Sequence, residues 1–119
     1  MQSARLTVLL LLIACLAIPS AAGKNRWQRY NATAYSVSGE TASGAQTREG
    51  RTVAGDPDIL PLGTKIQVKG AGRYSGIYVV HDSGRKIQGR EIDIFMGTAA
   101  EAKKFGKKQV MVRVLQSPK

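Results

Sequence analysis

Residues 81–95, HDSGRKIQGREIDIF, contain the clearest strand pattern of this sequence and the turn that precedes it. Side chains alternate from residue 90 to residue 96, which is the period of a β-strand. One face carries Ile92, Ile94 and Met96, and the other carries Glu91, Asp93 and Phe95. Carboxylates are uncommon in strands, and Asp93 between two isoleucines must either face water or be held by hydrogen-bond donors. The segment therefore predicts a strand that presents a carboxylate to a groove or to solvent.

Further short strands are expected on both sides of this segment. Strand patterns occupy residues 27–37, 65–69, 74–81 and 109–115. A single helix is expected over residues 98–105, with Thr98 as N-cap, Glu101 completing a capping box and Gly106 ending it. Residues 38–55 are rich in Gly, Ser and Thr, which is typical of a long functional loop. Five or six short strands with one helix predict an all-β barrel or a small α+β domain.

The first 22 residues are predicted to be a signal peptide. Arg5 supplies its positive charge, residues 6–18 form its apolar run, and small residues precede cleavage after Ala22. Two alternatives are a retained N-terminal anchor and a lipoprotein, since LIAC, ending at Cys15, resembles the motif at which bacterial lipoproteins are lipidated. Each alternative exports the chain, to the periplasm, the outer membrane or another part of the cell envelope.

The remainder is expected to form one domain. A polar N-terminal lead, residues 23–31, precedes a folded domain at residues 32–116, and the length of 119 residues excludes a separate cofactor-binding domain. Cys15 and His81 are the only residues of their types, so the exported domain has no disulfide and no His-rich zinc site. We therefore expect no metal and no organic cofactor.

The formal charge of +10 indicates what kind of partner the chain prefers. A basic exported domain is suited to an anionic polymer or surface, although a solvated basic face without a specific ligand has the same composition. Nucleic acid is the weaker interpretation, because the aromatic residues are scattered and form no stacking platform.

Three carboxylates are candidates for chemistry because they lie at turns or strand ends: Asp56, Asp82 and Asp93. An Asp in Asp-Pro or Asp-Ser-Gly is most often a turn residue, which is the ordinary explanation for the first two. Asp93, placed in a groove near Asp82, would have a raised pKa and could serve as a general acid. The alternative is a solvent-facing Asp93 paired with a Lys or Arg.

The sequence also resembles a known family. The resemblance covers roughly residues 32–115 and rests on several spaced motifs: TAYS (33–36), TASG (41–44), VAGDPDILPLGT (53–64), HDSGRKIQGREIDIF (81–95) and FGKKQVMVRVL (105–115). These motifs are similar to those of the 3D domain, named for three aspartates. That domain occurs in stationary-phase-survival-type proteins and in MltA-type lytic transglycosylases, and it is related to RlpA-like barrels.

The resemblance implies a six-stranded double-psi β-barrel with one short helix and a sugar-binding groove. It also implies cleavage of the bond between N-acetylmuramic acid and N-acetylglucosamine in peptidoglycan, with a 1,6-anhydro product. Asp93 matches the catalytic acid and Asp82 the aspartate that assists it. The remaining groove residues expected to contact substrate are Asp56, Thr33, Tyr35, Thr41 and Gln88. The expected partner is peptidoglycan, and the protein is expected to act as a monomer.

One part of the sequence departs from the family pattern. Between the second and third aspartates the family usually reads Gly-Gly-Ala-Ile-Lys-Gly, whereas residues 84–89 here read GRKIQG. Arg85 and Lys86 would lower the pKa of a nearby carboxylate, which opposes a general acid. A non-catalytic barrel that binds wall glycan, and a basic domain whose partner is another protein, are therefore the alternatives to the enzyme.

Overall fold

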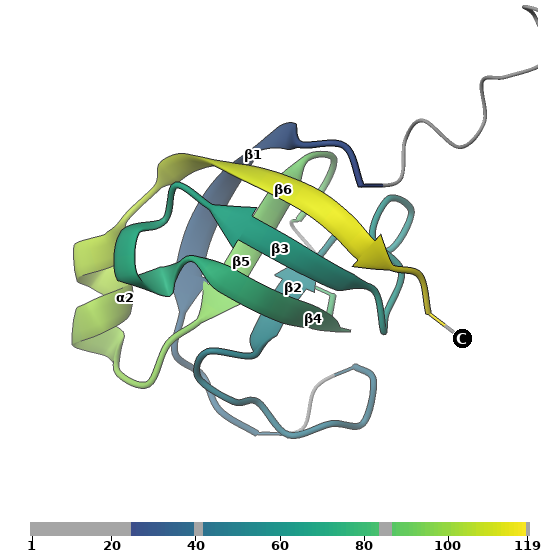
Figure 1. The fold of residues 1–119 in the computed structure, drawn as a ribbon. Helices are drawn as coiled ribbons and strands as arrows, with labels where there is room; N and C mark the ends of the chain where they lie inside the picture. The colour runs from purple at the N-terminus through teal and green to yellow at the C-terminus, as the bar shows by residue number, and fades with distance from the viewer. Residues whose placement is uncertain (1–24, 40–41, 84–86, 119) are drawn as a thin grey trace, which may run out of the picture.

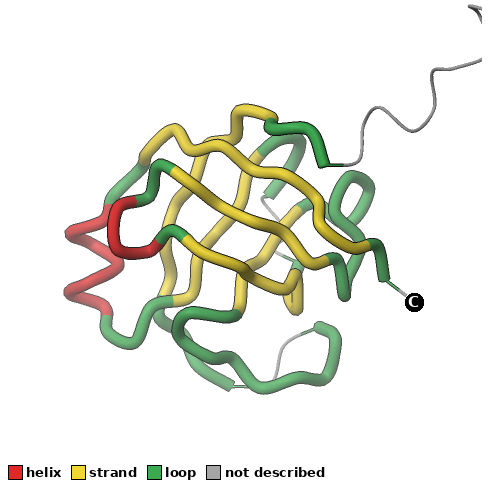
Figure 2. The backbone as a smooth tube through the Cα atoms, in the orientation of Figure 1, coloured by secondary structure: helices red, strands yellow, loops and turns green. Residues whose placement is uncertain are grey.

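The computed structural model describes residues 25–39, 42–83 and 87–118, which form a closed barrel of six strands (Figure 1). The strands are β1 (Gln28–Tyr35), β2 (Thr52–Gly55), β3 (Lys65–Lys69), β4 (Gly76–Asp82), β5 (Glu91–Phe95) and β6 (Lys108–Gln116). A 3₁₀ turn, η4 (Gly72–Tyr74), and one α-helix, α2 (Ala99–Phe105), lie at one end of the barrel (Figure 2).

The strand order around the barrel is β1-β5-β2-β4-β3-β6. Two of the pairs, β1–β5 and β2–β4, are parallel, and the other four are antiparallel. Neither parallel pair joins consecutive strands, because a parallel connection must carry the chain back to the same end of the barrel. The structure confirms the expected all-β double-psi barrel with one short helix.

The core forms where alternating strand residues point into the barrel. Successive side chains of a strand point to opposite faces, so every second residue points into the barrel. In a small barrel these inward side chains fill the interior. The inward residues of β3, β5 and β6 are almost fully buried: Ile66, Val68, Ile92, Ile94, Val110 and Val112. Met96 is buried with them, as predicted. Phe95 departs from the expected outward face, because it packs against Tyr35 with ring centroids 5.5 Å apart and is buried.

The helix begins and ends where its sequence predicts. The Thr98 side chain accepts a hydrogen bond from the backbone N–H of Glu101 at 3.1 Å, and Gly106 ends the helix with a φ of 67°. This φ is rare for residues with a Cβ. Phe105 in the last turn is buried and meets the ring of Tyr74 edge to face. The helix thereby closes one end of the barrel.

Two boundaries differ from the sequence expectation. β2 lies inside residues 38–55, which were expected to be loop throughout. β1 begins at Gln28, which agrees with the strand pattern at residues 27–37 but places the strand inside the polar lead assigned to residues 23–31. All four residues of β2 are buried, so this strand has no alternation that could reveal it. In the described part of the chain, no helix has the length and apolar content needed to span a bilayer. The expected signal peptide, including Cys15, lies outside the described residues.

Candidate functional site

The strand order brings two of the predicted aspartates to one row of the barrel. β2 lies between β4 and β5, and Ala54 of β2 pairs with Asp82 on one side and with Asp93 on the other. Neighbouring strands are about 4.8 Å apart, so the Cα atoms of the two aspartates are separated by roughly 10 Å. Ala54, the residue between them, is itself buried.

Asp93 is half-buried and is held by its neighbour on β1. The two strands are parallel, and Thr33 lies opposite Asp93 in their register. The Thr33 hydroxyl donates a hydrogen bond to Oδ1 of Asp93 at 3.0 Å. Burial raises the pKa of Asp93 above its ordinary value; the Thr33 hydrogen bond lowers it, and the nearby Asp82 raises it further. The net shift is upward, so Asp93 keeps its proton to a higher pH than an exposed aspartate.

Tyr35 lies two residues beyond Thr33 on the same strand. Its hydroxyl oxygen is buried, and among the described residues it has no hydrogen-bond partner. Burial is the main cause that raises the pKa of Tyr35, and the carboxylates of Asp82 and Asp93 both add to the shift. Tyr35 is therefore a neutral O–H group in the neighbourhood of both aspartates.

Asp82, at the end of β4, anchors the long loop that precedes β2. Its Oδ1 accepts hydrogen bonds from the backbone N–H groups of Ala42, at 3.2 Å, and Ser83, at 2.9 Å. The Ser43 N–H also donates to the carbonyl of His81 at 3.0 Å. At the other end of the loop, Glu49 accepts a hydrogen bond from the N–H of Gly97. The loop is thus attached both to β4 and to the start of the helix.

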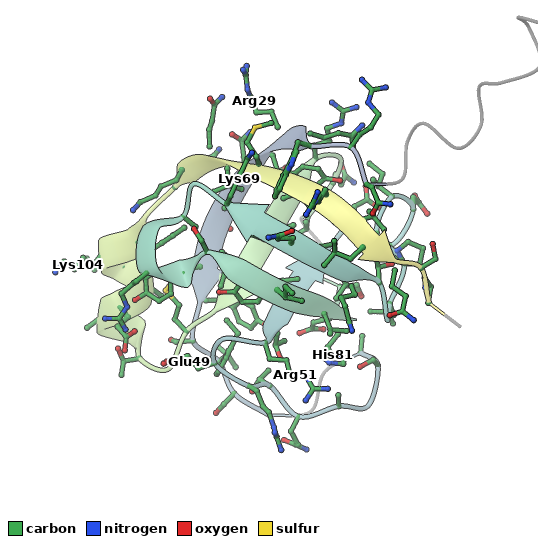
Figure 3. The ribbon with its side chains drawn as sticks, viewed as in Figure 1. Arg29, Glu49, Arg51, Lys69, His81 and Lys104 are labelled. Atoms are coloured by element: carbon green, nitrogen blue, oxygen red, sulfur yellow. The ribbon has the colours of Figure 1, made fainter. Side chains whose placement is uncertain are left out.

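Residues of the loop and His81 of β4 together line an open cavity. Its volume is about 260 Å³, and it is lined by Ala45, Gln46, Arg48, Arg51 and His81. Burial, followed by the charge of Arg51, lowers the pKa of His81. Its Nδ1 lies 3.2 Å from the Ser43 hydroxyl. Figure 3 shows Arg51 and His81 on the side of the barrel where this loop lies.

Sequence reasoning did not select the residues of this cavity. The signals that could have identified them were the position of His81 directly before Asp82 and the two arginines in a loop already marked as functional.

Asp56 has a different environment from the other two aspartates. Its Oδ1 accepts from the N–H of Asp58 at 2.9 Å, and its Oδ2 accepts from the N–H of Gly89 at 2.7 Å. The Gly89 hydrogen bond is the main cause that lowers the pKa of Asp56. Both oxygens therefore hold the backbone, and Asp56 ties the turn after β2 to the segment that leads into β5. Gln88, next to Gly89, is exposed.

Some residues named in the sequence analysis cannot be placed. Thr41, a predicted substrate contact, and Arg85 and Lys86, which depart from the family pattern, lie outside the described residues. No three His, Cys, Asp or Glu side chains within residues 25–39, 42–83 and 87–118 are close enough together to hold a metal ion. A second cavity, of about 280 Å³, lies between η4 and α2 and contains none of the predicted site residues.

Comparisons with known proteins identify the family to which the fold belongs. The family model of the 3D domain matches residues 51–116. The putative cell wall shaping protein YabE of Bacillus subtilis is 34% identical over 89 residues, covering 72% of this chain and 21% of that protein. The cell wall-binding protein YocH of the same organism is 35% identical over 89 residues, covering 72% of this chain and 30% of that protein.

A solved structure is similar over a comparable share of the chain. MltA from Escherichia coli, described by its lytic transglycosylase fold, has a TM-score of 0.58 and 25% identity, over 70% of this chain and 29% of that one. MltA has also been crystallised with bound chitohexaose. This chain spans less than a third of the length of each of these three proteins.

Proposed function

This chain belongs to the 3D-domain family, and from that premise we propose that it cleaves the glycan strands of peptidoglycan as a lytic transglycosylase. A role at the cell-wall glycan is supported by its similarity to wall-associated proteins and to MltA. The observation that carries the cleavage proposal is Asp93. It is half-buried, has a raised pKa, is held by Thr33, and lies across Ala54 from a second aspartate.

Asp93 acts first as an acid. It donates its proton to the oxygen of the glycosidic bond between N-acetylmuramic acid and N-acetylglucosamine, and the bond from that oxygen to the anomeric carbon breaks. The 6-hydroxyl oxygen of the muramyl sugar then bonds to the anomeric carbon, and its proton passes to the Asp93 carboxylate. Asp93 is thereby restored, and no water is consumed.

This chemistry needs only one carboxylate in the proton-transfer role. Glycosidases that use water require two carboxyl groups, one of them as nucleophile or base for water. Here the nucleophile belongs to the substrate, so the second carboxylate has another role. The negative charge of Asp82 raises the pKa of Asp93 and favours the positive charge that develops at the anomeric carbon.

Thr33 and Tyr35 serve Asp93 rather than the sugar itself. The Thr33 hydroxyl fixes the orientation of the Asp93 carboxyl through its 3.0 Å hydrogen bond. The Tyr35 hydroxyl is a neutral donor close to both carboxylates, and it stabilises the Asp93 carboxylate once the proton has left. Asp56 supports the segment before β5 through Gly89.

A second candidate function is glycan binding without cleavage. YocH is named a cell wall-binding protein, and it is 35% identical to this chain over 89 residues. In that case Asp82 and Asp93 would contribute only hydrogen bonds to sugar hydroxyls. The two candidates differ in whether the sugar products are released.

The test is incubation of the purified protein with peptidoglycan sacculi, followed by mass spectrometry of the released sugars. We expect anhydromuramyl products from the wild type and none from Asp93→Asn. Asp58→Asn is the matched control, since it removes an exposed carboxylate beyond the site and should cleave like the wild type. Binding to sacculi without release by any of the three proteins would exclude the enzyme and leave the binding function.

A further inference from the structure

Charged side chains are divided unevenly around the barrel. β3, β6 and β1 are consecutive neighbours, and these three strands contain no Asp or Glu. They carry Arg29, Lys65, Lys69, Lys108 and Arg113. The strands on the other half, β4 and β5, carry the acidic residues Asp82, Glu91 and Asp93. The barrel therefore has a carboxylate half, which holds the candidate site, and a cationic half, which we call the basic face.

The basic face points outward. The residues that alternate with its cations, such as Tyr30, Val68 and Val112, are buried in the core, so the cations must lie on the outer surface. Met111 of β6 pairs with Arg29 on one side and Lys69 on the other. Arg29 and Lys69 therefore flank one position, with Cα atoms roughly 10 Å apart across three strands. In Figure 3 they lie on the side of the barrel opposite Arg51 and His81.

Part of the face is already ordered. The Lys69 ammonium lies 4.0 Å from the ring centroid of Trp27, and the Arg113 guanidinium lies 4.7 Å from the same ring. Arg113 also donates a hydrogen bond from Nε to Oε1 of Gln67 at 2.9 Å. Cations held in this way lose less conformational freedom when a ligand binds. The described carboxylates form no ion pair with any cation of the face, so these cations are available to an external anion.

The surface chemistry favours a polymer over a membrane or a nucleic acid. The exposed large apolar residues of the described chain, Val37, Ile59 and Ile77, all lie outside β1, β3 and β6. Trp27 and Met111 at this face are only partly exposed, so the face has no extended apolar surface for insertion into a bilayer. Base stacking needs an accessible aromatic ring, and the ring of Trp27 at this face is contacted by two cations. The feature of the basic face that a ligand can recognise is therefore its row of positive charges along three strands.

We propose that the basic face binds an anionic polymer whose repeating unit carries phosphodiester groups and no aromatic ring. The phosphates would lie along β3, β6 and β1, away from the groove that contains Asp82 and Asp93. The domain would then hold a charged polymer on one side while its other side engages glycan. Binding at the basic face does not require cleavage.

The test measures binding of the full chain to a fluorescent poly(glycerol phosphate) by anisotropy at low and moderate salt. The double variant Arg29→Gln/Lys69→Gln removes two exposed cations from the face. Lys103→Gln/Lys104→Gln is the matched control, because it removes the same charge from the exposed surface of α2. We expect the dissociation constant to rise about tenfold for the first variant and less than about twofold for the second, and to rise with salt for the wild type.

Other outcomes would overturn the proposal. Equal weakening by both double variants would mean that net charge alone attracts the polymer. Tighter binding of phosphatidylglycerol vesicles or of an oligothymidylate through the same two residues would assign the face to a membrane or a nucleic acid. Asp93→Asn should bind the polymer like the wild type, so failure of the cleavage proposal and failure of this one are distinguishable.

Discussion

Replacing Tyr35 by Phe should stabilise the protein and slow its activity. The hydroxyl oxygen of Tyr35 is buried without a hydrogen-bond partner among the described residues. Such an unpaired group costs about 1–3 kcal/mol, because water that bonded to it in the unfolded chain is lost and nothing replaces it. Phe keeps the ring and its edge contact with Phe95, so only the cost of the hydroxyl is removed.

Urea denaturation and thermal melting measure this change. We expect Tyr35→Phe to raise the free energy of unfolding by about 1 kcal/mol or more, and a gain of 1 kcal/mol raises Tm by about 4–8 °C in a domain of this size. Tyr78→Phe is the matched control. Its hydroxyl is buried but donates to the carbonyl of Tyr74 at 2.6 Å, so its removal should lower the stability by about 1 kcal/mol.

The same substitution tests the functional role of Tyr35. If its hydroxyl stabilises the Asp93 carboxylate during cleavage, Tyr35→Phe should lower kcat with little change in KM. A protein destabilised as much as Tyr78→Phe would refute the view that the Tyr35 hydroxyl is unpaired. A stabilised variant with unchanged kcat would keep the structural reasoning and reject the role in catalysis.

Three further predictions concern pH and local structure. Because the folded protein raises the pKa of Asp93, wild-type stability should fall as the pH rises from the ordinary aspartate value through the raised one; Asp93→Asn should lack this fall in urea titrations. The pKa of Asp56 is lowered, so the stability it confers should be present at neutral pH and lost on acidification; Asp56→Asn should be less stable than the wild type at pH 7 and match it in strong acid. Thr98→Ala removes the helix N-cap and should cost about 1 kcal/mol in the same assay.

The parts of the fold that the sequence predicted are those determined by local patterns. The strand at 65–69 and the helix with its Thr98 cap are visible in the sequence, because alternation and capping act over a few residues. β2 was missed because it has only four residues and all of them are buried, so it shows no alternation of exposed and buried positions. Its partners, β4 and β5, come later in the chain, and local patterns contain no information about that pairing.

The candidate site likewise has one feature that the local sequence predicted and others that depend on distant segments. The sequence identified Asp93 as a candidate because a carboxylate between two isoleucines is unusual in a strand. Its pKa in the structure is raised, as a general acid requires. The arrangement around it depends on contacts between distant segments. Ala54 separates Asp82 from Asp93, and the backbone of Ala42 reaches Asp82 only after the long loop has folded against β4. The ring of Tyr35 likewise contacts Phe95, a residue expected on the outer face, and its hydroxyl is buried.

The central claim is that Asp93 drives cleavage in which the substrate supplies its own nucleophile. The most direct measurement is to digest sacculi in water enriched in heavy oxygen and to determine by mass spectrometry whether the new sugar ends contain the label. The account predicts anhydromuramyl ends without label for the wild type and no new ends for Asp93→Asn. Labelled reducing ends would show that water is the nucleophile, which would contradict it.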